Sequence, residues 1–175
     1  MVETVLVNRL LNPGEYRLRS LFPTIDAFHI LKTVFPEPAE LAEVLDFTSV
    51  LLIDSPHEMY VRNEDGGIVV GLAHLREASE TVLYLDIVHE LCHVGQHRAG
   101  RNLYDQSKSY VDRETEIEAY AVTVREARRL GLDEATIADY LLVSWITDEE
   151  HERLLNTLNV RPPSGTQPRP PRNGR

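Results

Sequence analysis

The amino-acid sequence predicts an α+β fold in which a small β-sheet packs on a buried helix. Three observations lead to this prediction. Short apolar or alternating segments bounded by turn residues lie before residue 72 and predict strands. Apolar residues at helical spacing predict helices over most of the chain after residue 79. On a helical wheel, the segment 82–98 (VLYLDIVHELCHVGQHR) is apolar around most of its circumference, which is typical of a core helix.

Length and composition favour one globular domain followed by a tail. The chain has 175 residues, of which 42% are hydrophobic and 26% charged, and this is enough to form a core. We predict a single domain over residues 1–160. The segment 161–175 (RPPSGTQPRPPRNGR) is rich in proline and arginine and has no core residues, so we expect a disordered or polyproline-like tail.

Charge, hydropathy and cysteine content restrict the possible partners and location. The net charge of −10 argues against nucleic acid as the main partner. No segment reaches the roughly 18–20 apolar residues of a membrane span, and the first residues lack the pattern of a secretory signal. The single cysteine, Cys92, excludes an internal disulfide framework and indicates a reducing compartment. We therefore expect a cytoplasmic protein that binds neither membranes nor nucleic acid.

The N-terminal third is predicted to begin with a hairpin and two helices. Residues 4–11 and 15–21 flank Asn12-Pro13-Gly14 and predict two paired strands. Thr24 can cap a helix whose apolar face is Ile25, Phe28, Leu31 and Phe35. A second helix from Pro38 would bury Leu41, Val44 and Leu45. The segment 49–53 then reads as a buried strand.

The middle of the chain predicts a hairpin followed by the buried helix. Residues 59–63 and 68–72 bracket Asp65-Gly66, a strong hairpin signal. Ser79 or Thr81 would cap the buried helix, which should end near Gly100.

The C-terminal part is predicted to be helical after a polar loop over residues 101–111. A helix should run from Asp112 to Leu130-Gly131, with an apolar face of Ile117, Tyr120, Ala121, Val124 and Ala127 or the stem of Arg128. Asp133 or Glu134 would begin a helix through Leu142, and Thr147 to Glu150 would cap a last helix through Leu158.

The buried helix carries the motif H-E-x-x-H as His89-Glu90-Leu91-Cys92-His93. Residues four apart lie on the same face of a helix, so the two imidazoles can bind one Zn²⁺, with the glutamate beside them to act on a metal-bound water. The polar residues Asp86, His89, Glu90, His93, Gln96 and His97 crowd into a sector of roughly 120°. A solvated helix with accidental histidines would not be apolar on its other sides.

A catalytic zinc needs a third protein ligand. Three and six residues after His93 the chain has Gln96 and Ala99, which excludes the metzincin pattern. His97 lies one turn beyond His93 and is either a supporting or substrate-facing residue or a solvent-exposed histidine at the helix end. The following helix offers three glutamates; Glu114 and Glu116 flank its apolar face, and Glu118 points away.

HELCH followed by Glu116-Ile117-Glu118-Ala119 resembles the gluzincins, zinc peptidases with two histidines and a downstream glutamate. The chain's size is similar to that of the minigluzincins and the ImmA/IrrE-like peptidases, and the resemblance covers roughly residues 57–130. It implies a zincin-like fold for this part of the chain, and His89, His93 and Glu116 as zinc ligands. The N-terminal third and the extra C-terminal helices after residue 131 are not identified by it. Tyr120 stands where these families often place an Asp or Asn that supports a ligating histidine. Either Asp86 or a tyrosine hydroxyl would have to take over, or the site is looser than in these families.

The resemblance and the motif imply a zinc-dependent endopeptidase that acts on peptides or proteins. Glu90 would take the proton of a zinc-bound water and pass it to the leaving amine. Tyr110 is our preferred oxyanion donor among the candidates Tyr104, Tyr110, Tyr120, His74 and His97. The segment 68–72 resembles the edge strand that receives substrate in zincins, and the alternative is a core strand. Cys92 is interpreted as a small core residue.

Two alternatives remain open at this stage. One is a zinc-binding regulatory or scaffold protein. The other is a latent peptidase whose tail or C-terminal helices cover the cleft.

Overall fold

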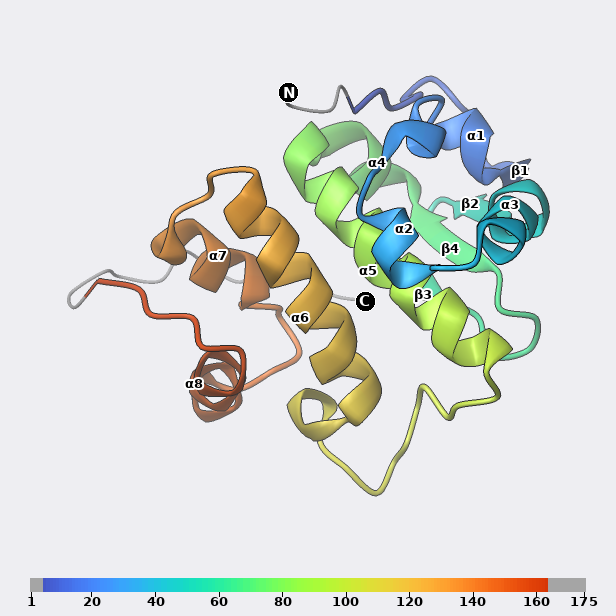
Figure 1. The fold of residues 1–175 in the computed structure, drawn as a ribbon. Helices are drawn as coiled ribbons and strands as arrows, with labels where there is room; N and C mark the ends of the chain where they lie inside the picture. Colours follow the sequence, from blue (N-terminus) through green and yellow to red (C-terminus); the bar gives the residue numbers. More distant parts are fainter. Residues whose placement is uncertain (1–4, 164–175) are drawn as a thin grey trace.

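The strands lie in the first half of the chain, and the second half is helical. The computed structural model describes residues 5–163, which form a four-stranded sheet and eight α-helices, so the α+β class is confirmed (Figure 1). The first half contains β1 (Gly14–Arg17), α1 (Leu18–Leu21), α2 (Leu31–Val34), α3 (Pro38–Phe47), β2 (Ser49–Ile53), β3 (Met59–Val61), β4 (Ile68–Gly71) and α4 (Leu72–Glu77). The second half contains α5 (Glu80–Arg98), α6 (Glu114–Arg129), α7 (Glu134–Leu141) and α8 (Asp148–Thr157). Single 3-10 turns are η1 (Ile25–Ala27) and η2 (Tyr110–Asp112).

The sheet has the strand order β1-β2-β4-β3, with β2 and β4 parallel and the outer pairs antiparallel. The predicted hairpin is confirmed as β3 and β4, since Gly66 in its turn has φ 72° and the Asp65 carboxylate accepts from the Gly67 amide at 3.0 Å. The expectation that residues 68–72 form an edge strand is wrong. Strand β4 lies between β2 and β3 with all four residues buried, and among the described residues the edge strands are β1 and β3.

The predicted N-terminal hairpin is wrong. Within the described residues 5–21, β1 is the one strand, and it pairs with β2. Leu18 and Leu21 are both fully buried, which one helical turn achieves because residues three apart share a face. The predicted helix from Thr24 is also interrupted, since η1 and α2 are separate short turns, although its four apolar residues are all buried.

Several local predictions are confirmed by the capping contacts. Ser79 accepts a hydrogen bond from the amide of Val82 and begins α5, which ends just before Gly100 at φ 74°. Asp133 caps α7, and Thr147 and Glu150 form a capping box on α8. The predicted α3 and β2 also form as expected. The predicted tail reaches from 161 to 175, and its residues 164–175 lie outside the described part of the chain.

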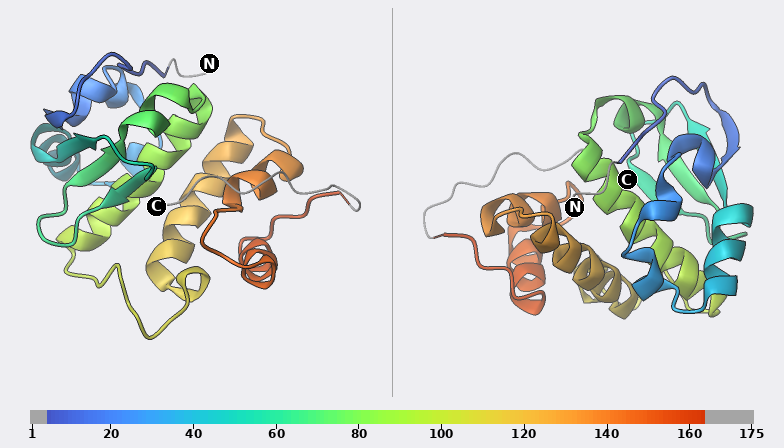
Figure 2. Two further views of the ribbon diagram at one scale, coloured as in Figure 1. Left: turned by 180° about the vertical axis from the view of Figure 1, so that it is seen from behind. Right: turned by 45° about the horizontal axis from the view of Figure 1, so that its top comes forward.

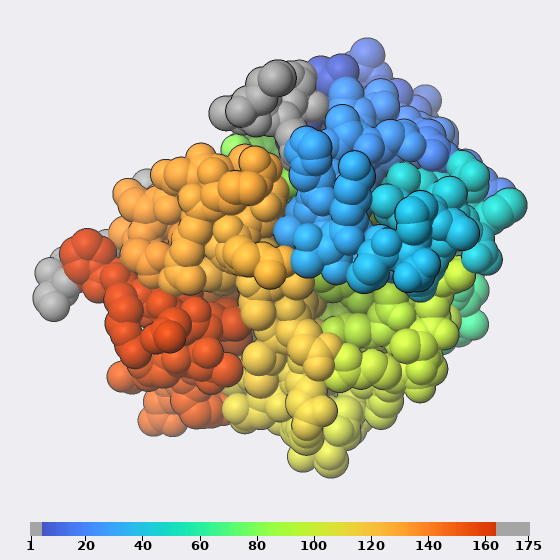
Figure 3. Space-filling model, viewed as in Figure 1, coloured from blue at the N-terminus to red at the C-terminus, as the bar shows by residue number. Residues whose placement is uncertain are grey.

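Helix α5 lies between the sheet and the C-terminal helices. It packs against β3 and α2 on one side and against α6 on the other, and α7 and α8 lie beyond α6 (Figures 1 and 2). In the space-filling view, the orange and yellow residues of α6 contact the neighbouring yellow-green and blue segments directly (Figure 3). Within residues 5–163, no helix is long and apolar enough to cross a membrane.

Candidate metal centre

Helix α5 brings two histidines together in the core. His89 and His93 are 1% and 3% exposed, and their Nε2 atoms lie 3.0 Å apart. Every residue of α5 from Leu83 to Val94 is buried, including the polar ones. The predicted buried helix with a polar sector is therefore present, and it turns this sector towards α6.

Helix α6 supplies Glu116 to the same place, because its buried face differs from the predicted one. Ala121 is exposed and Ile117 only partly buried, contrary to the prediction. The buried face contains Thr115, Glu116, Ala119, Tyr120, Thr123, Val124, Glu126 and Ala127. Since α6 packs on a polar part of α5, its inner face carries polar residues that hydropathy alone does not assign to the interior.

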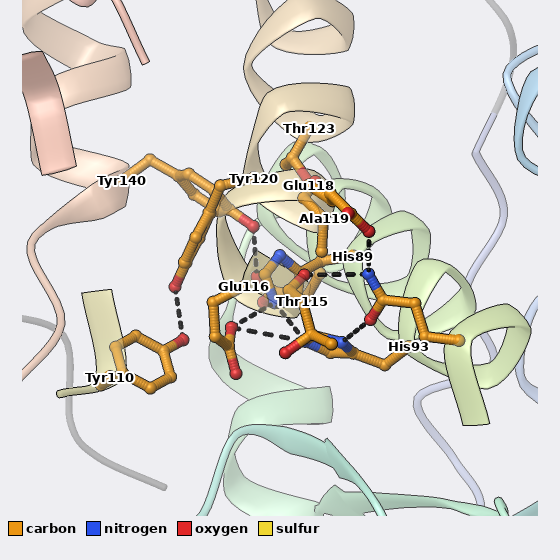
Figure 4. A network of polar contacts seen from close by, with 12 residues as sticks. His89, His93, Tyr110, Thr115, Glu116, Glu118, Ala119, Tyr120, Thr123 and Tyr140 are labelled. Carbon is orange, nitrogen blue, oxygen red and sulfur yellow. Dashed lines mark hydrogen bonds and ion pairs between the residues drawn. The ribbon is translucent and has the colours of Figure 1, made fainter. Parts of the chain in front are cut away.

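The spacing of the three side chains matches one metal ion. The Glu116 Oε2 atom lies 3.3 Å from the Nε2 atom of His89 and 3.3 Å from that of His93 (Figure 4). Four ligands around zinc at about 2.0–2.1 Å lie roughly 3.3 Å from one another. His89, His93 and Glu116 thus form a buried group that could hold a metal ion.

The neighbouring glutamates are engaged elsewhere. Glu114 is exposed and pairs with Lys108 at 3.1 Å. Glu118 is also exposed and forms an ion pair with Arg101. Of the three glutamates considered from the sequence, Glu116 is therefore the one that meets the histidines.

The protonation of the cluster follows from burial and from the Glu116 charge. Burial lowers the pKa of His89. Burial also opposes ionisation of Glu116, but the charge of His93 and hydrogen bonds with both histidines hold the pKa of this carboxyl well below its usual value. Burial by itself lowers the pKa of His93, and the carboxylate of Glu116 outweighs it and raises that pKa. A divalent cation would replace the His93 proton as the partner of this buried carboxylate.

The second ring nitrogen of His93 is held by Gln96. The Nδ1 atom of His93 lies 2.7 Å from Gln96 Oε1. The Gln96 Nε2 group donates to the Thr115 carbonyl and to Glu118 Oε2, both at 3.0 Å. Because these acceptors fix the amide's orientation, Gln96 Oε1 accepts the Nδ1 proton and leaves Nε2 with its lone pair for a metal.

His89 has a different environment. Its Nδ1 atom is buried and has no hydrogen-bond partner among the described residues. The expectation that Asp86 or a tyrosine hydroxyl supports this ring is wrong. Asp86 accepts from Tyr140 at 2.9 Å and lies 2.8 Å from His74 Nε2. Tyr120 packs its ring on His89 at a centroid distance of 4.3 Å and directs its hydroxyl to Tyr110.

Glu90 and Cys92 lie between the two histidines in sequence. Glu90 is fully buried, and it lies close enough to the cluster for its charge to interact with both His89 and His93. Cys92 is buried as predicted, and burial raises the pKa of its thiol to about 12. The thiol therefore stays protonated near neutral pH and is a poor metal ligand.

A hollow of about 370 Å³ opens beside Glu116. Its lining is mostly aromatic and consists of His57, Tyr60, Tyr104, Tyr110, Arg113, Glu116 and Trp145. Tyr110 and Tyr104 from the predicted list of oxyanion donors line it. His74 and His97 do not; the Nε2 atom of His97 lies 3.0 Å from the Asn63 carbonyl oxygen, and its side chain borders a separate hollow.

Sequence reasoning missed Gln96, His57, Arg113 and Trp145 as residues around the centre. Gln96 had a detectable signal, because it lies in the polar sector of the α5 wheel. The other three come from separate segments whose convergence no local pattern reveals.

Comparison with known proteins adds no relative. A scan against protein-family models finds no matching family, and searches of curated proteins and of solved structures find no match.

Proposed function

We propose that this chain is a zinc-dependent peptidase with a zincin-like architecture, of the gluzincin type that its motifs resemble. The observation that carries this proposal is the fully buried Glu90 beside a His89–His93–Glu116 cluster. A purely structural metal site has no use for an additional buried carboxylate, since burying a charge without a role is costly. A hydrolytic site needs one as a general base.

Zinc is the metal that best suits these donors. Two imidazole nitrogens and one carboxylate oxygen form the ligand set of catalytic zinc sites, which keep a fourth position for water. Bound there, zinc would lower the pKa of that water and polarise a substrate carbonyl.

The protein's own residues then have distinct tasks. Glu90 would accept a proton from the attacking water and deliver it to the leaving amine. Tyr110, at the wall of the hollow, would donate a hydrogen bond to the oxyanion. Strand β3 packs on α5 and has a strand partner on one side only within residues 5–163. The part of its outer edge before the Val61 carbonyl, which accepts from Tyr104, can therefore pair with an extended substrate.

The test combines metal content with hydrolysis of an unstructured protein substrate. The purified chain should hold about one zinc and cleave the substrate, while Glu90→Gln keeps the zinc and loses at least about a hundredfold in rate. Glu114→Gln is the matched control, because Glu114 is exposed and should change neither quantity. Full activity in Glu90→Gln would contradict the proposal. Zinc without any hydrolysis by the unsubstituted chain would favour a regulatory zinc protein.

A further inference from the structure

The hollow beside Glu116 is assembled from segments far apart in the sequence. His57 and Tyr60 come from β3 and the loop before it, and Tyr104 and Tyr110 come from the loop between α5 and α6. Trp145 lies between α7 and α8. The rings meet edge to face, with centroids 5.9 Å apart for His57 and Tyr60, and 5.6 Å apart for Tyr110 and Trp145. The hollow therefore has two aromatic walls, one from the sheet side and one from the helical side.

Specific contacts fix the wall on the sheet side. The Tyr104 hydroxyl donates to the Val61 carbonyl of β3 at 2.5 Å. The backbone of His57 lies so close to Gly71 that a Cβ atom there would come 1.7 Å from the His57 carbonyl oxygen. This wall is therefore built into the packing of β3 and β4 before any ligand enters.

The hollow is continuous with the metal centre. Glu116 itself lines it. On the helical side, the Tyr110 hydroxyl lies 2.8 Å from that of Tyr120, whose ring packs on His89 (Figure 4). A group bound in the hollow would thus lie next to Glu116 and would be connected to His89 through Tyr110 and Tyr120.

Arg113 is a cation on the lining with unused hydrogen-bond donors. Its Nε group donates to the Asp105 carbonyl at 3.1 Å, and its guanidinium lies 5.9 Å from the centre of the Tyr110 ring. Within the described residues, neither terminal nitrogen has an acceptor or an ion-pair partner. Nearby arginines differ: Arg101 pairs with Glu118, and Arg153 with Asp112. The Asp105 carboxylate is close enough for its charge to interact with that of Arg113, but these two described side chains do not form an ion pair.

We infer that this hollow is a substrate pocket that takes an aromatic side chain together with a neighbouring carboxylate, which Arg113 binds. This rests on the proposed peptidase function and names its substrate class. A volume of about 370 Å³ accommodates one aromatic residue, and the surrounding rings allow edge-to-face packing. A guanidinium with two free terminal nitrogens binds a carboxylate through two parallel hydrogen bonds. The carboxylate belongs either to an acidic side chain or to the peptide's C-terminus.

Trp145 provides a direct readout, because it is the chain's one tryptophan and lies in the wall of the hollow. The full chain carrying Glu90→Gln and loaded with zinc should bind short acetylated peptides without cleaving them, followed by Trp145 fluorescence and by titration calorimetry. One pair of peptides ends in Phe with a free carboxylate or an amide. A second pair has internal Phe-Glu or Phe-Gln and an amide end. A fifth peptide has Ala in place of Phe in whichever of the two acidic peptides binds more tightly.

We expect the acid of at least one pair to bind about tenfold or more tightly than its neutral counterpart, and which pair does so identifies the source of the carboxylate. Replacing Phe by Ala should weaken binding about tenfold. Arg113→Gln should abolish the acid preference and keep the Phe preference. Arg125→Gln should change nothing, since Arg125 is exposed on α6 and outside the lining.

If the chain that keeps Arg113 binds acid and neutral peptides equally, the inference is overturned. This comparison does not depend on whether an Arg113 variant folds. An acid preference that survives Arg113→Gln would also overturn it. The binding measurement does not depend on turnover. If the peptides bind but the chain that keeps Glu90 does not hydrolyse them, only the peptidase proposal is contradicted. Hydrolysis with no preference for Phe or for an acid contradicts only the pocket.

Discussion

His93 and His89 lie one helical turn apart on α5, but the protein holds the two rings by different means. The Nδ1 atom of His93 is 2.7 Å from Gln96, which is bonded in turn to the Thr115 carbonyl and to Glu118 on α6. The Nδ1 atom of His89 has no such partner in the described part of the chain, and the ring packs on Tyr120. One histidine is thus oriented by hydrogen bonds, and the other by packing.

This difference has consequences for metal binding. Hydrogen bonds select the ring tautomer that presents Nε2 to a metal, whereas packing fixes only the direction of the ring. An unpaired buried nitrogen also costs about 1–3 kcal/mol, so the His89 side contributes less to stability than the His93 side. The polar network from His93 through Gln96 and Glu118 to Arg101 further ties α5 to α6.

The largest expected effect comes from removing either ring. His89→Ala and His93→Ala should each reduce the zinc content from about one ion per chain to near zero after dialysis, because two remaining ligands do not hold a catalytic zinc. Elemental analysis of the dialysed proteins measures this. Stoichiometric zinc in either variant would show that the two histidines are not joint ligands.

Glu116→Gln should weaken zinc binding by at least tenfold, which is more than we expect for substitutions of the supporting residues. It removes the one charged carboxylate that lies 3.3 Å from the Nε2 atoms of both histidines. Competition with a chelator of known affinity gives the constant. Glu114→Gln is the control on the same helix and should bind zinc as the unsubstituted chain does. A reversed result would move the third ligand to Glu114.

Gln96→Ala tests the His93 side of the comparison. It should weaken zinc binding about tenfold, the lower end of the 10–100-fold range for supporting residues, because the His93 ring itself remains. Unchanged zinc affinity in Gln96→Ala would remove the distinction between the two histidines.

The smallest effect is expected on the His89 side. Tyr120→Phe removes the hydroxyl and keeps the ring that packs on His89, so zinc affinity should stay within about twofold. The same chelator competition measures it. A tenfold loss would mean that the hydroxyl supports His89 after all.

The sequence by itself determined the features that depend on local periodicity. Local patterns predicted the helix that carries His89, Glu90 and His93, the burial of this helix and its N-terminal cap at Ser79. They also predicted the hairpin at Asp65-Gly66. Each follows from side chains within a few residues of one another, where backbone geometry permits few arrangements. The same reasoning limited the candidates for a third metal-binding residue to the glutamates at the start of α6.

Tertiary structure decided what depends on which surfaces meet. It determined that β1 pairs with β2 and that Glu116, rather than Glu114 or Glu118, faces the histidines. It also determined that Gln96 is the hydrogen-bond partner of His93, whereas Asp86 contacts Tyr140 and His74. It also gathered Tyr60, Arg113 and Trp145 around one hollow. A strand's alternation does not identify its partner, and a helix with polar residues on several sides does not reveal how it is rolled. These choices follow from the burial and hydrogen bonding of segments far apart in the chain.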